Sequence, residues 1–282
     1  MHPVLFNVFG LFDLHTYGLM IALGFLIGMN LGAREARRID LSTEGNFDQF
    51  ILDLTFWILI AAIAGSRLLY FAVEDFMGLV TAPWKFFYIW EGGLVFYGGL
   101  LGAVILSIFY SRRKGRSFLV VADTLIPSVS LGQFFGRIGC YAAGCCWGDP
   151  VDAAHPLAVQ FPPGSLAYQS MQQHGLIAHD AVASLHVHPV QLYESAGNLT
   201  LFFILIMLRT QKRFHGMVLC GYLFLYPFLR FSVEFVRGDA GRGEDMLGTI
   251  FSTSQLISLG LFTTGVILAV YGMGQRKKLH AA

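Results

Sequence analysis

Six ionisable side chains fall within long apolar stretches of this 282-residue sequence. They are Arg67, Asp123, Arg137, Glu194, Arg230 and Glu234. A charge in an apolar medium is costly, so such residues mark a functional site unless they serve only to pair with one another. The three arginines predict an anion as ligand, because a guanidinium can hold a phosphate through two parallel hydrogen bonds. The chemistry indicated is the recognition of a phosphate in an apolar setting.

A purely structural interpretation of the same residues stays open. Three of the six are positive and three are negative, so the set can be internally neutral and can hold helices in register. Such pairing is a reasonable account of any single residue. Pairing alone explains less well why three arginines would lie at the same depth. Their depth depends on the helices that carry them.

The composition identifies the setting as a membrane. Hydrophobic residues make up 55% of the chain and charged residues 13%, whereas a soluble globular protein carries about 25% charged residues. So few charges cannot cover the surface of a water-soluble protein of this size. The net charge of +1 is too small for a nucleic-acid-binding protein, whose affinity depends on neutralising phosphates. Four cysteines do not make a disulfide framework.

Seven stretches are long and apolar enough to cross a bilayer, which takes roughly 20 residues of helix. They are Leu14–Ala33, Leu54–Val73, Gly92–Ser111, Phe118–Gly136, Pro189–Leu208, Gly216–Val236 and Met246–Gly274. We therefore expect an all-α polytopic membrane protein with seven transmembrane helices, forming a single integral membrane domain over residues 1–282. The start MHPVLFNVFG has no basic region and no cleavage site, so no signal peptide is expected.

Basic residues predict the orientation of these helices. The segments after the first, third, fifth and seventh stretches hold 13 of the 19 Lys and Arg residues. Because basic loops stay in the cytoplasm, the N-terminus is expected outside and the C-terminus in the cytoplasm. Residues 148–188, which contain no Lys or Arg, are then expected to form a small extracytoplasmic head segment between transmembrane helices 4 and 5.

This orientation places three arginines in the outer half of the membrane. Arg67, Arg137 and Arg230 fall in the outer parts of the second, fourth and sixth stretches, at the level expected for Tyr17 and Tyr97. The abundant anion at that depth is the phosphate of a phospholipid headgroup. The residues alone thus predict a phospholipid-phosphate site that opens to the outer leaflet.

Five short motifs lie at these positions. They are HTYGLM from residue 15, WEGGLVFYGG from residue 90, GRIG from residue 136, HPVQLYE from residue 188, and the set Tyr226, Arg230, Glu234, Phe235 and Arg237. In this order and spacing they resemble the bacterial prolipoprotein diacylglyceryl transferase family along nearly the whole chain. The HPxQLYE and GRxG segments are the specific signals.

The resemblance implies a multi-pass enzyme of the bacterial plasma (inner) membrane, with its active site toward the outer leaflet. Family members transfer the diacylglyceryl group of phosphatidylglycerol to the lipobox cysteine of a prolipoprotein signal peptide, the first step of lipoprotein maturation. Glycerol phosphate is released. The implied partners are phosphatidylglycerol, prolipoproteins and membrane lipids, without nucleic acid. No metal and no redox cofactor is implied.

The resemblance also implies roles for individual residues. Arg137 and Arg230 would bind the phosphate and stabilise the leaving group, and Tyr97 would be the third residue of the catalytic set. The expected substrate-binding residues are Tyr17, Arg67, Gly98, Gly99, Glu194, Tyr226, Glu234 and Arg237. Among these, Tyr17 and Tyr226 would position the headgroup or substrate by hydrogen bonding, and an apolar groove between helices would take the acyl chains.

The chain departs from the family pattern in two places. Tyr97 stands where the family usually has a His considered as the base for the thiol proton, and a phenol is a poor base at neutral pH. Cys140, Ala143 and Cys145 stand where the family usually has Asn, Asn and Glu. Without the His, the identity of the base stays open between the carboxylates of the site and a phosphate oxygen of the substrate.

The three clustered cysteines, Cys140, Cys145 and Cys146, allow several interpretations. They are small packing residues in a Gly-rich turn, or Cys140 forms a disulfide with one of the other two in an oxidising compartment, or they bind a metal with His155 or another His of the head segment. Their spacing matches no zinc template.

The alternatives to the transferase are the same fold with another lipid donor or thiol acceptor, a membrane thiol oxidoreductase that uses these cysteines, and a transporter or lipid flippase.

Overall fold

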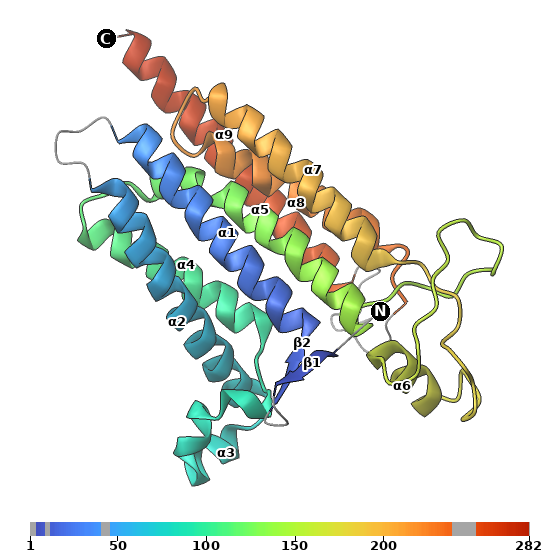
Figure 1. The fold of residues 1–282 in the computed structure, drawn as a ribbon. Coiled ribbons are helices and arrows are strands. Elements are labelled where there is room, and N and C mark those ends of the chain that lie inside the picture. Colours follow the sequence, from blue (N-terminus) through green and yellow to red (C-terminus); the bar gives the residue numbers. More distant parts are fainter. Residues whose placement is uncertain (1–3, 9–11, 41–45, 239–251, 282) are drawn as a thin grey trace. The chain divides into compact units, whose positions relative to one another are not determined.

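The computed structural model describes residues 4–8, 12–40, 46–238 and 252–281 of the chain. A short β-hairpin precedes a series of helices (Figure 1). Strands β1 (Val4–Val8) and β2 (Phe12–His15) pair antiparallel. The helices are α1 (Thr16–Ile39), α2 (Phe47–Val73), α3 (Phe76–Thr81), α4 (Phe96–Arg113), α5 (Phe118–Ala143), α6 (Leu166–Gln173), α7 (Val190–Thr210), α8 (Met217–Glu234) and α9 (Thr253–Ala281), with 3-10 turns η1 (Pro83–Phe87) and η2 (Ile89–Glu91).

Six of the described helices are long and apolar enough to cross a membrane. They are α1, α2, α5, α7, α8 and the part of α9 from Thr253 to Gly274. The chain is therefore a multi-pass membrane protein, as its composition predicts. A helix also forms at the third expected stretch, but α4 has only 18 residues and ends on Arg112 and Arg113. It is not among the six, so the seventh span and the orientation stay predictions.

The helices differ from the expected stretches mainly at their ends. Helix α2 begins at Phe47 rather than Leu54, and α5 continues to Ala143 rather than Gly136. The backbone hydrogen bonds of a helix continue beyond the end of the apolar run, so hydropathy alone underestimates the length of the helix. The β-hairpin is not predicted by the sequence, and residues 246–251 of the seventh stretch lie outside the described residues.

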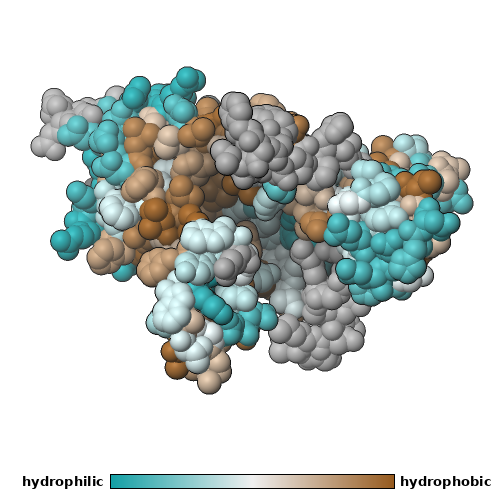
Figure 2. Space-filling model, turned by 60° about the horizontal axis from the view of Figure 1, so that its bottom comes forward, coloured by the Kyte–Doolittle hydropathy of each residue, from teal (hydrophilic) through white to brown (hydrophobic). Residues whose placement is uncertain are grey.

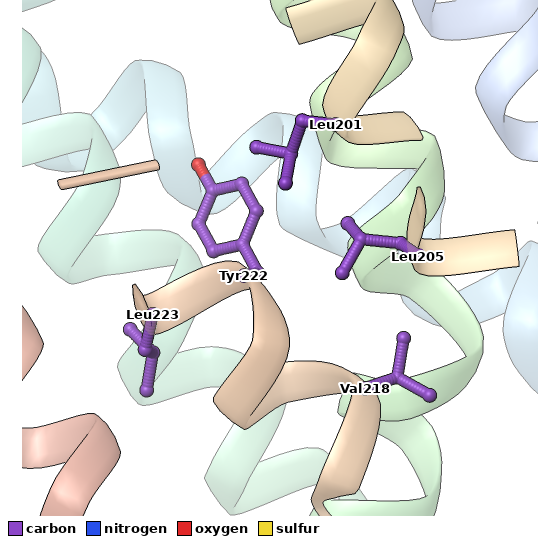
Figure 3. Close-up of a cluster of buried hydrophobic side chains, with 5 residues drawn as sticks. All are labelled: Leu201, Leu205, Val218, Tyr222 and Leu223. Carbon is purple, nitrogen blue, oxygen red and sulfur yellow. The ribbon is translucent and has the colours of Figure 1, made fainter. Parts of the chain in front are cut away.

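The chain divides into two compact units, Met1–Gly28 with Leu125–Ala282, and Met29–Thr124, and each is described by itself. In the first unit α7 packs against α8, and α8 packs against α9 (Figure 1). Side chains from α7 and α8 interdigitate in a buried apolar cluster (Figure 3) formed by Leu201, Leu205, Val218, Tyr222 and Leu223. Helix α5 joins this group through the hydroxyl of Ser130, which donates to the carbonyl of Asn198 at 2.8 Å.

Residues 148–188, between α5 and α7, form a head with a small core of its own within the first unit. The buried core residues are Phe161, Ala167, Met171 and Val187, and Tyr141 and Trp147 pack against them. Gly148 bridges to Arg237, beyond the end of α8. The surface of the head, at the right of the space-filling view, is largely hydrophilic (Figure 2). The head is therefore anchored to the ends of α5 and α8, and its extracytoplasmic location stays a prediction.

In the second unit α2 and α4 pack closely because both helices present glycines at their contact. A Cβ atom added to Gly65, Gly98 or Gly102 would collide with a backbone carbonyl of the opposite helix. Small residues allow this close approach in membrane helices. The packing fixes the beginning of α4, where Tyr97 lies.

Candidate functional site

Glu194 lies at the centre of a buried cluster of ion pairs in the first unit. It belongs to the first turns of α7, and its side chain is only 2% exposed. Its Oε2 lies 2.6 Å from Nε of Arg137 on α5. Its Oε1 lies 3.5 Å from Nη1 of Arg237 and 3.9 Å from Nη1 of Arg230. Guanidiniums from two distant parts of the sequence, Arg137 on α5 and Arg230 with Arg237 at the end of α8, thus surround one carboxylate.

Glu234 supplies the second carboxylate of this cluster. Its Oε2 lies 2.5 Å from Nη1 of Arg230, one turn earlier on α8. Its Oε1 accepts hydrogen bonds from the hydroxyls of Ser252, at 2.8 Å, and Ser254. These serines connect the end of α8 to the beginning of α9. The sequence does not single them out, because a hydroxyl near the end of an apolar helix is common and carries no functional signal.

Among the residues that the structure describes, three arginines face two carboxylates in this cluster. The side chains of Arg230 and Arg237 are 10% and 3% exposed. Arg137 is 20% exposed, and beyond its Nε contact it makes no ion pair or hydrogen bond with any residue that the structure describes. The pairing interpretation left open by the sequence therefore applies, and anion binding stays a prediction. The ion pairs join α5, α7 and α8, and the terminal nitrogens of Arg137 can still bind an anion.

One face of α8 carries the polar and aromatic residues of the site. Tyr222, Tyr226, Arg230 and Glu234 recur every four residues, which places them along a single side of the helix. The rings of Tyr222 and Tyr226 stack with centroids 5.1 Å apart and planes at 5°. The Tyr222 hydroxyl donates to Oε1 of Gln133 at 3.1 Å. Sequence reasoning missed Tyr222, although its spacing from Tyr226 and Arg230 is the signal that could have found it.

The HPVQLYE segment contributes several distinct contacts. Nδ1 of His188 lies 3.2 Å from the Tyr193 hydroxyl, and Nε2 of Gln191 donates to the carbonyl oxygen of Cys145 at 2.7 Å. Glu194 then binds the arginines. The segment thus orders the turn that follows α5 and supplies the central carboxylate of the cluster.

Cys140, Cys145 and Cys146 direct their sulfur atoms toward one another. The three Sγ atoms all lie within 4.8 Å of one another, and the thiols are free. Cys140 is in the last turn of α5, one turn after Arg137, and the other two lie in the turn that follows. Cys146 adopts a φ of 60°, a left-handed conformation that is uncommon for residues other than glycine. The disulfide considered from the sequence is not formed among these thiols.

The cysteine cluster borders the arginine cluster and Tyr17. Hydrogen bonds from the other two thiols, with nearby Arg137 and Arg237, lower the pKa of the Cys146 thiol. The corresponding hydrogen bonds, together with burial, raise the pKa of Cys145. Of these two thiols, Cys146 is therefore the one that loses its proton more readily. Tyr17, in the first turn of α1, is 42% exposed and within electrostatic range of these thiols.

In the second unit, Arg67 binds backbone carbonyls. It is 3% exposed, and it donates to the carbonyl oxygens of Lys85, Phe86 at 3.1 Å and Gly92 at 2.7 Å. Its guanidinium carbon lies 4.9 Å from the ring centroid of Phe71. Arg67 therefore holds the loop that connects α3 to α4, and a contact with substrate stays a prediction.

Tyr97 and the two glycines after it open α4 in the same unit. Tyr97 is 41% exposed. Gly98 and Gly99 are buried against α2, and a Cβ on Gly99 would lie 2.5 Å from the Ser66 hydroxyl. The glycines thus have a packing role that the sequence reasoning did not give them. The substrate contacts predicted for all three residues stay predictions.

Comparison with known proteins assigns this chain to a family. The family model described as prolipoprotein diacylglyceryl transferase matches residues 3–271. The chain belongs to this family. It is 35% identical over 271 residues to the phosphatidylglycerol–prolipoprotein diacylglyceryl transferase of Idiomarina loihiensis, covering 95% of this chain and 92% of the relative. It is 33% identical over 268 residues to that of Clostridium tetani, with 95% and 96% covered, and 32% identical over 285 residues to that of Escherichia coli, with 99% and 96% covered.

Membership of the prolipoprotein diacylglyceryl transferase family confirms the resemblance read from the motifs and identifies the chain as a transferase. It favours that activity over the thiol oxidoreductase and transporter alternatives. The first unit contains the predicted site residues Tyr17, Arg137, Glu194, Tyr226, Arg230, Glu234 and Arg237. The second unit contains Arg67, Tyr97, Gly98 and Gly99. The structure directly connects the three arginines and two glutamates of the first unit.

Proposed function

We propose that this chain transfers the diacylglyceryl group of phosphatidylglycerol to the lipobox cysteine of prolipoproteins. Family membership over nearly the whole chain supports the activity. The observation that carries the site assignment is the Glu194-centred cluster, in which three arginines face two carboxylates. Guanidinium groups bind phosphates through parallel hydrogen bonds, and the partly exposed side chain of Arg137 supports the phosphate of phosphatidylglycerol as the ligand.

The reaction needs a cation where negative charge develops. The sulfur of the acceptor cysteine attacks the glycerol carbon that bears the phosphate ester, a C–S bond forms, and the C–O bond breaks. The phosphate oxygen keeps the bonding electron pair, and glycerol phosphate leaves with an additional negative charge. Arg137 and Arg230 hold the phosphate and stabilise that charge, which is worth most in a site from which water is excluded. The thiol loses its proton before or during the attack.

The remaining predicted residues position this reaction. Glu194 fixes the guanidinium of Arg137 through Nε, which leaves both terminal nitrogens for the phosphate. Tyr17 and Tyr226 hydrogen-bond to the headgroup or the peptide. Glu234 orients Arg230 through their 2.5 Å contact, and Arg237 binds Glu194 from the far side of the cluster.

Residues of the second unit have supporting roles in this proposal. Tyr97 hydrogen-bonds an oxygen of the headgroup. Arg67 acts through the loop that it holds, because four backbone carbonyls lie within hydrogen-bond reach of its guanidinium. Gly98 and Gly99 bring α4 against α2 and thereby fix Tyr97.

We further propose that α4 is the seventh span, with the N-terminus outside and the C-terminus in the cytoplasm of the bacterial inner membrane. Arg112 and Arg113 would extend from the end of this 18-residue helix to the cytoplasmic headgroups. The head and the arginine cluster would then face the outer side, so that an outer-leaflet lipid and a translocated signal peptide can both reach the site.

The test is incubation of the purified chain in detergent with phosphatidylglycerol and a peptide that carries a lipobox cysteine. We expect a peptide product heavier by one diacylglyceryl group, with release of an equal amount of glycerol phosphate. A peptide with Ser in place of the cysteine and a donor with a phosphocholine headgroup are the controls. If no product forms with phosphatidylglycerol or with any other phospholipid, the transferase assignment is refuted.

A further inference from the structure

Three cysteine sulfurs converge at the end of α5, where Cys140 and Cys145 stand in place of the Asn and Glu that the family usually has. Sγ of Cys140, Cys145 and Cys146 all lie within 4.8 Å of one another. In the described part of the chain this is the only group of three Cys, His, Asp or Glu side chains that approach so closely. Cysteines that merely fill space in a turn have no reason to direct their sulfurs at a common point.

The backbone holds this convergence in place. The amide of Cys145 donates to the carbonyl of Cys140 at 3.1 Å, and Gln191 binds the carbonyl of Cys145 at 2.7 Å. The left-handed φ of Cys146 turns its side chain toward the same point as that of Cys145, its neighbour in the sequence. The C-x4-C-C spacing alone, which matches no zinc template, does not reveal this.

We propose that Cys140, Cys145 and Cys146 form a metal site for a soft divalent ion of the Zn²⁺ type, with one coordination position left open. With Zn–S bonds of about 2.3 Å, a tetrahedral site has its sulfurs about 3.8 Å apart, so the thiols need to close by no more than about 1 Å. Thiolates select soft ions of this kind. Three protein ligands with a free fourth position are the arrangement of catalytic rather than structural zinc sites. This inference departs from the expectation of a metal-free enzyme.

The surroundings of the cluster are compatible with a charged metal site. Arg137 interacts electrostatically with Cys146 and Cys140, and Arg237 with Cys146. Three thiolates outweigh the charge of a divalent ion, so the loaded site is anionic and the neighbouring guanidiniums stabilise it. A disulfide would use only two of the three sulfurs and would leave the position of the third unexplained.

The open position gives the site a role in the reaction, and this part rests on the proposed function. The acceptor cysteine would bind there as the fourth thiolate, because a thiol that coordinates zinc is deprotonated. Its proton goes to solvent, its sulfur forms the bond to the glycerol carbon, and the phosphate leaves with the electron pair of the C–O bond. The metal is neither oxidised nor reduced. The site would thus supply the thiolate in a chain where Tyr97 replaces the usual His.

Metal binding is tested on the full chain, reduced and purified in detergent, then loaded with Zn²⁺ or Co²⁺ and freed of excess. We expect one metal ion per chain, and for Co²⁺ the intense thiolate charge-transfer absorption of a tetrahedral site. Single Ser variants at positions 140, 145 and 146 should each lower the affinity at least about tenfold, the loss that even an outer partner of a metal ligand causes. Cys220→Ser, at a buried cysteine of α8, is the matched control and should bind like the wild type.

Adding a lipobox peptide to the Co²⁺ form tests the open position. A cysteine peptide should increase the thiolate charge-transfer absorption, and the corresponding Ser peptide should not. Reduced wild-type protein that takes up no more metal than the triple Ser variant would overturn the site. An unchanged spectrum with the cysteine peptide would overturn its role as acceptor position. A metal-free chain that transfers lipid refutes only the role of the metal in the reaction, whereas a metal-loaded chain without transfer activity refutes only the proposed function.

Discussion

Replacing Arg137 separates an ion-pair role from a phosphate-binding role, because the two ends of its guanidinium have different surroundings. Nε lies 2.6 Å from Oε2 of Glu194, and the terminal nitrogens make no ion pair or hydrogen bond with any other residue that the structure describes. A lysine carries a single ammonium group. Arg137→Lys can therefore pair with Glu194 or contact a phosphate, but it cannot do both as the arginine does.

The expected magnitudes follow from these contacts. Arg137→Ala should lower the transfer rate by about 10²–10³, the usual loss of one donor to a developing negative charge in a water-excluded site. The transfer rate of Arg137→Lys should exceed that of Arg137→Ala by less than about tenfold, because lysine does not restore two parallel hydrogen bonds to the phosphate. Both variants should fold. Arg237 and Arg230 remain 3.5 and 3.9 Å from Oε1 of Glu194, so its buried charge stays compensated.

The assay is the initial rate of thioether formation on a lipobox peptide at saturating phosphatidylglycerol, with the thermal midpoint of each purified variant as the folding control. Near-normal activity of a folded Arg137→Lys variant would mean that Arg137 only pairs with Glu194. Near-normal activity of Arg137→Ala would remove Arg137 from the mechanism altogether.

Three further predictions concern other parts of the chain. Tyr97→Phe should lower the transfer rate only about two- to tenfold, the value of one neutral hydrogen bond; a thousandfold loss in folded protein would show that the hydroxyl is catalytic. Gly98→Ala should destabilise the protein by about 1–3 kcal/mol, seen as a lower thermal midpoint, because its Cβ collides with the Gly65 carbonyl. Gly132→Ala, with open space at its Cβ, is the control, and equal midpoints would contradict the packing. Single cysteines placed in residues 148–188 should react with a membrane-impermeant reagent in intact cells, and labelling only after permeabilisation would reverse the predicted orientation.

The helices could be predicted from the sequence because a membrane helix is encoded by length and apolarity alone. Their ends could not, since the hydrogen-bond ladder of α2 and α5 extends past the apolar run. The hairpin of β1 and β2 has no strong turn signal. The 18 residues of α4 end on two arginines, so hydropathy describes this helix less clearly than the other six.

The ion-pair cluster was partly predictable because Arg137, Glu194, Arg230 and Glu234 are anomalies in apolar stretches. Which charges meet depends on helix packing, and hydropathy carries no information about it. Gln191 was less accessible to sequence reasoning, because its role is a contact with a backbone carbonyl. The convergence of the three sulfurs depends on one residue in a left-handed conformation, Cys146. No residue pattern in the sequence predicts that conformation.

The most direct test of the central claim, that the Glu194-centred cluster binds the lipid phosphate, is a comparison of lipid affinities. Binding of phosphatidylglycerol and of diacylglycerol, which lacks the phosphate, is measured for wild type and for Arg137→Ala in the same detergent. We expect wild type to prefer phosphatidylglycerol by at least about tenfold, since charged hydrogen bonds contribute about 1.5–3 kcal/mol each. The variant should lose most of this preference. Equal preference for phosphatidylglycerol in wild type and variant would contradict the account.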